Sequence, residues 1–223
     1  MGQSKEDMIN SALHDLCTSL TAIAAKKLQV ALQEAQFRAT FVEVRGEDHT
    51  ARLEFVGWHT WEDAPPRSMQ MRKVFRLGEG CAGLAWHRNR AVIEDEFKDG
   101  HEWRDNYEGQ NKKYKSMISV PVRSGYSDTG EQVIGVVTVD TQLAGYFGKK
   151  GDQQAEDRAS AMIAPYGTYI AFVCALDGSV AKMKEIGAQA GGLAADLFPK
   201  LGGQRQLSLP DTGPSPAAPK RGR

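Results

Sequence analysis

The sequence has no excess of charge of either sign. Its 223 residues include 28 Lys and Arg and 28 Asp and Glu, which gives a formal net charge of zero. A protein that binds nucleic acid or an anionic membrane through its overall charge carries a basic excess. The composition therefore predicts no nucleic acid and no membrane among the partners.

Cysteine is also scarce. The chain has only Cys17, Cys81 and Cys174, and none of them forms a Cys-x-x-Cys pair. This odd, widely spaced set predicts neither a disulfide framework nor a zinc or dithiol redox motif, and it fits a reducing compartment. His87 and His101 likewise lie at no recurrent ligand spacing from nearby carboxylates, so we expect no metal site.

Long hydrophobic runs are missing as well. The N-terminus lacks the basic start and apolar core of a signal peptide. The longest uncharged stretch, residues 162–176, is too short to span a bilayer, and it contains Pro165 and Gly167. We therefore expect a soluble, cytoplasmic protein.

A helical pattern is present at the N-terminus. Ser4 and Asp7 have the spacing of a capping box. Large apolar residues then recur in steps of four and three: Ile9, Leu13, Leu16, Leu20 and Ile23. This predicts an amphipathic helix over residues 1–36. Its narrow seam fits a helix lying on its own domain or a helix that pairs in a homodimer, and both can hold together.

From Phe37 the hydrophobic period changes to two. Apolar and polar residues alternate through 37–41 and 53–55, which predicts a pair of antiparallel strands. The whole pattern predicts an α/β (α+β) domain over residues 37–176, with about six strands. Its other elements are extended structure at 71–77, a short helix at 82–88, strands at 91–95, 116–123 and 132–140, and a terminal helix at 152–176.

The C-terminal part has weaker patterns. Pro165 should bend the terminal helix, and Asp177-Gly178 should interrupt it. We predict a second, weaker helical extension over residues 177–201. Residues 202–223 are rich in Gly, Pro, Ser and Gln with few large apolar side chains, which predicts a disordered tail.

Four short motifs, in their order and spacing, resemble a GAF domain. They read GEGCAGLAW at 78–86, AVIED at 91–95, SVPV at 119–122 and VIGVVTVD at 133–140. The glycines let a strand turn sharply into a helix, and the last two motifs suit adjacent central strands. The chain thus resembles a stand-alone GAF domain protein over roughly residues 36–176.

The resemblance implies a six-stranded antiparallel sheet, with helices for packing and dimerisation on one face and a ligand pocket under loops on the other. Residues 95–115 would roof that pocket. The predicted ligand-binding residues are Trp86, Glu94, Asp95, Trp103, Arg104, Tyr107, Tyr114 and Asp140. Aromatic side chains there suit stacking on a planar ligand or cation, and their alternative use is to pack loops over the sheet. Asp140 can accept a ligand hydrogen bond or cap the turn that follows it.

Three branches of this fold have defined chemistry. The free methionine-R-sulfoxide reductases use cysteines in the glycine-rich turn and the pocket loop, but here Cys81 stands one place early and residues 100–105 contain no second cysteine. The cyclic-nucleotide binders carry Asn-Lys where this chain has Asp140-Thr141. Covalent bilin attachment needs a pocket cysteine, and none lies between residues 82 and 173. We expect no covalent bilin, and the cofactor stays unknown.

Together these features predict a non-catalytic GAF protein that senses a small molecule, forms a homodimer and signals through a separate partner protein, since the sequence encodes no recognisable output module. Two alternatives remain. One is a cysteine-dependent redox enzyme that uses Cys81 and resembles the reductases. The other is a structural interaction module whose pocket is filled by its own aromatic side chains.

Overall fold

The fold is described from a computed structural model. The structure describes residues 3–59, 74–95, 115–125 and 131–197. The chain divides into two compact units, Met1–Val180 and Ala181–Arg223. The first unit contains the sheet. In the second unit the structure describes helical residues 181–197, and the predicted tail at 202–223 lies outside the described residues.

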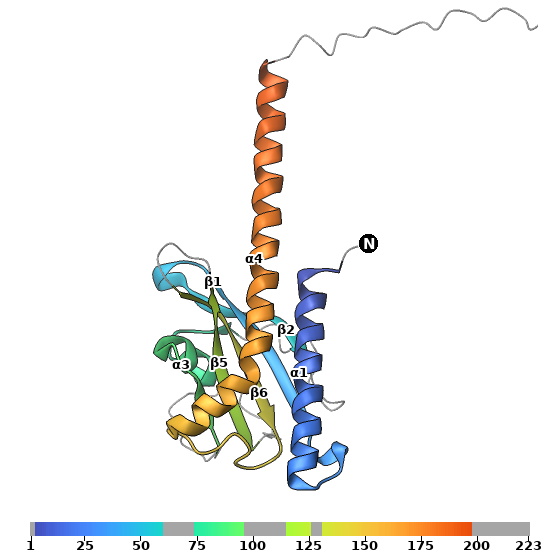
Figure 1. Ribbon diagram of the computed structural model, residues 1–223. Helices are drawn as coiled ribbons and strands as arrows, with labels where there is room; N and C mark the ends of the chain where they lie inside the picture. The colour runs from blue at the N-terminus through green and yellow to red at the C-terminus, as the bar shows by residue number, and fades with distance from the viewer. Residues whose placement is uncertain (1–2, 60–73, 96–114, 126–130, 198–223) are drawn as a thin grey trace, which may run out of the picture. The chain divides into compact units, whose positions relative to one another are not determined.

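Within the described residues, six strands form one antiparallel sheet in the order β3-β2-β1-β6-β5-β4 (Figure 1). They are β1 (Phe37–Arg45), β2 (Arg52–His59), β3 (Val74–Phe75), β4 (Val92–Glu94), β5 (Ser116–Ser124) and β6 (Gln132–Thr141). The predicted six-stranded antiparallel architecture is confirmed. The first three residues of the predicted segment 71–77 lie outside the described part of the chain.

The pairing of β1 with β6 forms the centre of the sheet. It joins residues about a hundred positions apart, from Phe37 opposite Thr141 to Glu43 opposite Gly135. A Cβ atom at Gly135 would lie 2.5 Å from the ring of Phe41, so only glycine fits this position without a shift. This explains the glycine in the last of the four motifs.

Helix α1 (Lys5–Leu28) begins with the predicted capping box. The Ser4 hydroxyl accepts the Asp7 N–H at 3.1 Å, and the Asp7 carboxylate accepts the Ser4 N–H at 3.2 Å. The helix ends earlier than the predicted residue 36, because Gln29 adopts a left-handed conformation with φ of 56°. One 3-10 turn, η1 (Leu32–Glu34), follows.

The seam of α1 is buried on its own domain. Four of its five apolar residues are almost fully buried: Ile9, Leu13, Leu16 and Leu20. The helix packs closely on β2, since a Cβ atom at Gly57 would lie 2.5 Å from Ile9 Cγ2. Only Ile23 of the seam is exposed, at 48%. The first of the two interpretations of the seam is therefore confirmed.

The described residues form two further α-helices, α3 (Gly80–Arg88) and α4 (Gln153–Leu197). Figure 1 shows α4 bent in its N-terminal part, as expected for a helix that contains Pro165. The predicted interruption at Asp177-Gly178 is wrong. A single glycine costs a helix only about 1 kcal/mol, and a long helix absorbs that cost.

Two histidines meet where α1 packs on β2. The rings of His14 and His59 make an edge-to-face contact with centroids 4.7 Å apart. Burial, followed by the charge of His14, lowers the pKa of His59 below its usual value. The native state therefore binds a proton at His59 less readily than the unfolded state does.

Because His59 binds a proton less readily in the native state, the free energy of unfolding should increase with pH. Above the unfolded histidine pKa of about 6.5, His59 is neutral in both states and has no effect on the free energy of unfolding. As the pH falls below that value, the unfolded state takes up a proton more readily than the native state, so the free energy of unfolding decreases. We expect the free energy of unfolding, measured by urea titration between pH 5 and pH 8, to rise less steeply in a His59→Gln variant than in the wild type. Equal slopes in the two proteins would contradict this.

Candidate ligand-binding site

The sheet separates two buried clusters. Helices α1 and α4 contribute to the cluster on one face, together with alternate strand residues such as Ile118, Val137 and Val139. Helix α3 contributes to the cluster on the other face: Val42, Leu53, Cys81, Ala82, Ala85, Val92 and Val136. We refer to these as the α1/α4 face and the α3 face. The α3 face is the one on which the resemblance places a ligand pocket.

Polar residues follow one line across the α3 face. Strand register places Glu94 of β4 opposite Met117 of β5, Met117 opposite Asp140 of β6, and Asp140 opposite Arg38 of β1. Because alternate strand residues share a face, all four point toward the α3 side. We call Glu94, Asp140 and Arg38 the polar row. Two of its members, Glu94 and Asp140, are each only 2% exposed.

Asp140 is held by a guanidinium group. Arg38 donates to Asp140 Oδ2 from Nε at 2.8 Å and lies 2.7 Å from it through a terminal nitrogen. Two donors of one guanidinium on a buried carboxylate form a strong, charge-assisted contact. The contact also joins β1 to β6 at the centre of the sheet.

Glu94 has a different cationic neighbour. Lys150, in the segment before α4, lies 3.3 Å from Glu94 Oε2, and its backbone N–H donates to the carboxylate of Asp95 at 3.4 Å. Lys150 is 40% exposed on its side chain, whereas Glu94 is buried. Lys150 and Glu94 therefore form a polar site in which the lysine faces solvent and the carboxylate is buried.

A second polar pair lies on the same face. Ser119 and Thr138 sit opposite each other on β5 and β6, and their hydroxyl oxygens are 2.8 Å apart. Ser119 is fully buried. Hydroxyl groups that both donate and accept can rearrange toward a ligand at small cost. Together with the polar row, they make the centre of the α3 face polar.

The structure brings some of the predicted residues together. Glu94 and Asp140 lie in one row, two strands apart, or about 10 Å at the usual strand spacing. Asp95 is half-buried directly after Glu94, and Trp86 packs partly buried beside the α3 cluster. Trp103, Arg104, Tyr107 and Tyr114, with most of the predicted roof, lie outside the described residues.

Sequence reasoning missed Arg38 and Lys150. Arg38 reads as an ordinary polar residue of an alternating strand, and its partner Asp140 is 102 positions away. Lys150 belongs to a Gly-Lys-Lys-Gly turn that reads as a solvated loop. The only available signal was that a buried carboxylate at the end of a central strand needs a cation nearby.

Cys81 lies beneath this face as a buried thiol. Its sulfur is 3.4 Å from the carbonyl oxygen of Val92, to which the thiol donates. Burial is the main cause that raises the pKa of Cys81 to about 12, and the nearby Glu94 carboxylate adds to it. The thiolate is the nucleophilic form of cysteine, so Cys81 is protonated and unreactive near neutral pH.

The burial of the Cys81 thiol predicts that it reacts slowly with a thiol reagent. In native protein at pH 8, we expect Cys81 to react with Ellman's reagent far more slowly than free cysteine, and to react fully after unfolding in guanidinium. Cys81→Ala is the matched variant, because it should remove one equivalent only from the unfolded total. A fast native phase that disappears in Cys81→Ala would show that the thiol is activated.

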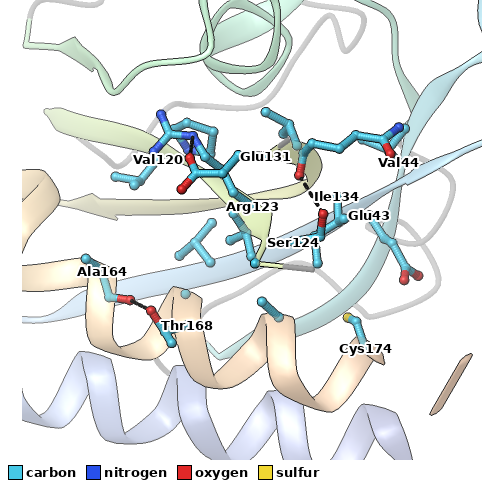
Figure 2. Close-up of a pocket in the computed structure, with 18 of the residues that line it drawn as sticks. Glu43, Val44, Val120, Arg123, Ser124, Glu131, Ile134, Ala164, Thr168 and Cys174 are labelled. Atoms are coloured by element: carbon cyan, nitrogen blue, oxygen red, sulfur yellow. Dashed lines mark hydrogen bonds and ion pairs between the residues drawn. The ribbon is translucent and has the colours of Figure 1, made fainter. Parts of the chain in front are cut away.

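A cleft of about 930 Å³ lies on the other side of the sheet, between β5, β6 and α4 (Figure 2). Its apolar lining includes Val120, Val122, Ile163, Gly167 and Ala171. Sequence reasoning placed no cleft on this face. The spaces beside a helix depend on where the helix rests on the sheet, which local patterns do not reveal.

Several polar groups that line the cleft have partners within the structure. Arg123 donates to the side chain of Asn89 at 3.0 Å and to its carbonyl at 2.8 Å, and Glu131 lies 3.8 Å from Arg123. The Thr168 hydroxyl donates to the Ala164 carbonyl at 3.0 Å, as drawn in Figure 2. The cleft is also lined by the buried carboxylate of Glu43, which lies 2.7 Å from Lys5. We take the α3 face as the candidate for a polar ligand because it holds two buried carboxylates, Glu94 and Asp140, on the side where the resemblance places a pocket.

Comparison with known proteins finds similarity at the level of solved structures. No protein family and no curated protein matches the chain. The GAF domain of the Acinetobacter phosphoenolpyruvate-protein phosphotransferase is 17% identical, with 82% of this chain and 99% of that chain covered and a TM-score of 0.45. The A. aeolicus nlh2 GAF domain, in an inactive state, is also 17% identical, with 78% and 97% covered and a TM-score of 0.44.

A structure of an enzyme is found alongside them. The type II free methionine-R-sulfoxide reductase from Thermoplasma acidophilum is 17% identical, with 75% of this chain and 94% of that chain covered and a TM-score of 0.43. At these identities the similarity concerns the fold alone. The chain has the GAF-like fold that its sequence predicts, and its function rests on its own residues.

Proposed function

We propose that this protein is a non-catalytic, small-molecule-sensing GAF protein that forms a homodimer and acts through a separate partner protein. The observation that carries the proposal is the polar row, in which Glu94 and Asp140 are buried at the centre of the α3 face. Buried charges seldom add net stability to a fold, so two buried carboxylates on the face where the resemblance places a pocket favour a binding role there. The ligand would be small and polar, with groups that meet both carboxylates and cations.

The cysteine positions argue against a redox enzyme. Cys81 belongs to the cluster on the α3 face, whereas Cys17 and Cys174 belong to the cluster on the α1/α4 face. The sheet lies between them, and a disulfide requires Cα atoms within about 7 Å. Within one chain, Cys81 therefore has no thiol with which to form or resolve a disulfide.

Contacts through the sheet offer a route for a signal. The Arg38–Asp140 pair joins β1 and β6, and the opposite side of β1 is covered by α1. Helix α1 is in turn joined to α4, since the hydroxyls of Ser19 and Tyr166 are 2.9 Å apart. A ligand that draws Asp140 or Arg38 toward itself would favour one packing of these helices over another.

A thermal-shift experiment tests the binding role. The small-molecule fraction of a cell extract, separated by chromatography, supplies the probes. A ligand present at a hundred times its Kd stabilises a protein by about 2.7 kcal/mol, which raises Tm by about 5 to 10 °C for a domain of this size. We expect at least one fraction to produce such a shift in the wild type.

Two variants locate the site. Asp140→Asn keeps the shape of the side chain but removes its charge, and we expect it to lose most of the shift. Glu131→Gln removes a carboxylate at the cleft on the other face, and it should keep the shift. If no fraction shifts the wild type, or if only Glu131→Gln loses the response, the α3 face is not the ligand site.

A further inference from the structure

The cleft between α4 and the sheet (Figure 2) has two walls of different character. The sheet contributes branched apolar side chains, among them Val120 and Val122 of β5 and Ile134 of β6. Helix α4 contributes small residues, which leave room between the helix and the sheet: Ser160, Ala164, Gly167, Ala171 and Ala175. The volume of about 930 Å³ is within the range of small-molecule pockets, so the cleft can hold a ligand with an apolar body.

A buried carboxylate lines one end of this cleft. Glu43 of β1 is 9% exposed, and Figure 2 shows it at the same end of the cleft as Cys174. Lys5 of α1 lies 2.7 Å from Glu43 Oε1, and Arg45 lies 2.5 Å from Oε2. Among the described residues, those that line the cleft include Glu43 but neither of these two cations. The carboxylate therefore faces the cleft, while its cationic neighbours approach it from other directions.

One oxygen of this carboxylate can accept a further hydrogen bond. Within the described part of the chain, Glu43 Oε2 is buried and receives no hydrogen bond, although Arg45 lies near it. A carboxylate has about four acceptor positions, so two neighbouring cations do not saturate it. A buried acceptor without a donor keeps its desolvation cost. A ligand that donates a hydrogen bond to Oε2 would offset that cost.

The charges along the cleft favour a cationic ligand. The charged residues that line it are Glu43, Glu131 and Arg123, so carboxylates outnumber cations. Arg123 already donates twice to Asn89, and Glu131 is 72% exposed, which leaves Glu43 as the buried charge. Burial is the main cause that raises the pKa of the Cys174 thiol to about 11, and the Glu43 carboxylate adds to it. The thiol is therefore neutral near pH 7, and an anion in the cleft would meet a buried carboxylate of its own sign.

We propose that this cleft is a second ligand site, which binds a primary amine with an aliphatic body. The ammonium group would lie on the Glu43 carboxylate, and the aliphatic body would lie between α4 and the strands β5 and β6. A primary ammonium offers three N–H donors, and its hydrogen bonds to a carboxylate are about twice as strong as bonds between neutral groups. The site is on the opposite face of the sheet from the polar row and does not depend on any ligand there, so the two proposals can fail separately.

Isothermal titration calorimetry of the full chain at pH 7 tests the site with three probes of equal chain length: octylamine, which is protonated at this pH, octan-1-ol and octanoate. We expect octylamine to bind with a Kd below about 1 mM, octan-1-ol to bind at least ~10-fold more weakly, and octanoate to bind most weakly. Glu43→Gln should raise the Kd of octylamine at least ~10-fold, because it removes the charge that holds the ammonium group. Glu54→Gln changes an exposed carboxylate of β2 outside the cleft, and it should leave the Kd unchanged.

A labelling experiment on the wild type locates the probe even if circular dichroism shows that Glu43→Gln has lost structure. Cys174 lines the cleft and is half-buried, whereas Cys17 and Cys81 are buried elsewhere in the domain. We expect octylamine at about 10 mM, roughly ten times the upper limit of its Kd, to slow the modification of Cys174 by N-ethylmaleimide several-fold, as measured by peptide mass spectrometry. Octanoate should leave that rate unchanged. No binding of octylamine, equal Kd values for the three probes, an unchanged Kd in folded Glu43→Gln, or binding without protection of Cys174 would each overturn the proposal.

Discussion

Replacing Asp140 with alanine is expected to lower the free energy of unfolding by about 3 to 5 kcal/mol. The substitution leaves the Arg38 guanidinium, whose side chain is 19% exposed, without its carboxylate at the centre of the sheet. A buried charge that loses its partner keeps its desolvation cost and gives up the attraction that offset it. Chemical denaturation followed by circular dichroism measures the difference directly.

An exposed ion pair in the same sheet supplies the control. Arg52 and Glu54 lie 2.6 Å apart, and their side chains are 53% and 36% exposed. Glu54→Ala should therefore cost less than about 1 kcal/mol. Equal losses in Asp140→Ala and Glu54→Ala would contradict the view that the polar row is buried and tightly paired.

The double variant Arg38→Met/Asp140→Leu separates stability from function. Replacing both charges with apolar side chains of similar size should recover much of the stability lost in Asp140→Ala, because no buried charge is left unpaired. The same variant should give no thermal shift with ligand-containing fractions. A stable double variant that still responds would place the ligand elsewhere.

Leu16→Ala is expected to have an effect of similar size, a loss of about 2 to 5 kcal/mol in the free energy of unfolding. Leu16 is fully buried where α1 packs on the sheet, and its truncation leaves a cavity that the neighbouring side chains fill only in part. Urea denaturation at a single protein concentration provides the measurement.

Ile23 is the matched control on the same helix. It belongs to the same sequence seam as Leu16 but is 48% exposed, so Ile23→Ala should cost less than about 1 kcal/mol. If Leu16→Ala instead dissociated a dimer without lowering the stability of the monomer, the seam of α1 would be an intermolecular surface.

Much of the fold could be predicted because its signals are local. The period of two in β1 and β2, the capping box of Ser4 and Asp7, and the glycine-rich turn before α3 each lie within a few residues. The apolar seam of α1 was ambiguous, since a helix on its own sheet and a helix in a dimer show the same spacing. The burial of Leu13 and Leu16 shows that the helix lies on its own domain.

The break predicted in α4 failed for an energetic reason. Asp177-Gly178 weakens a helix, but about 1 kcal/mol is small beside the packing that fixes the residues before it. Asp177 also lies 3.6 Å from Lys5 of α1, a contact that no local pattern indicates. Local propensity therefore placed the helix correctly and its interruption wrongly.

The candidate site was only partly predictable. The resemblance indicated Glu94 and Asp140 as pocket residues, whereas the approach of Arg38 and Lys150 depends on long-range strand register and on the path of the chain before α4. The cleft beside α4 depends on how that helix rests on the sheet. Contacts between distant segments are fixed by the assembled core, which periodicity alone does not specify.

The central claim is that the protein is a dimer that holds a small molecule without covalent attachment. Native mass spectrometry of the full chain, purified without denaturation from the cells that encode it, tests both parts in one spectrum. We expect a dimer whose mass exceeds that of two chains by a small-molecule increment that disappears on denaturation. A bare monomer, or an increment that survives denaturation, would contradict it.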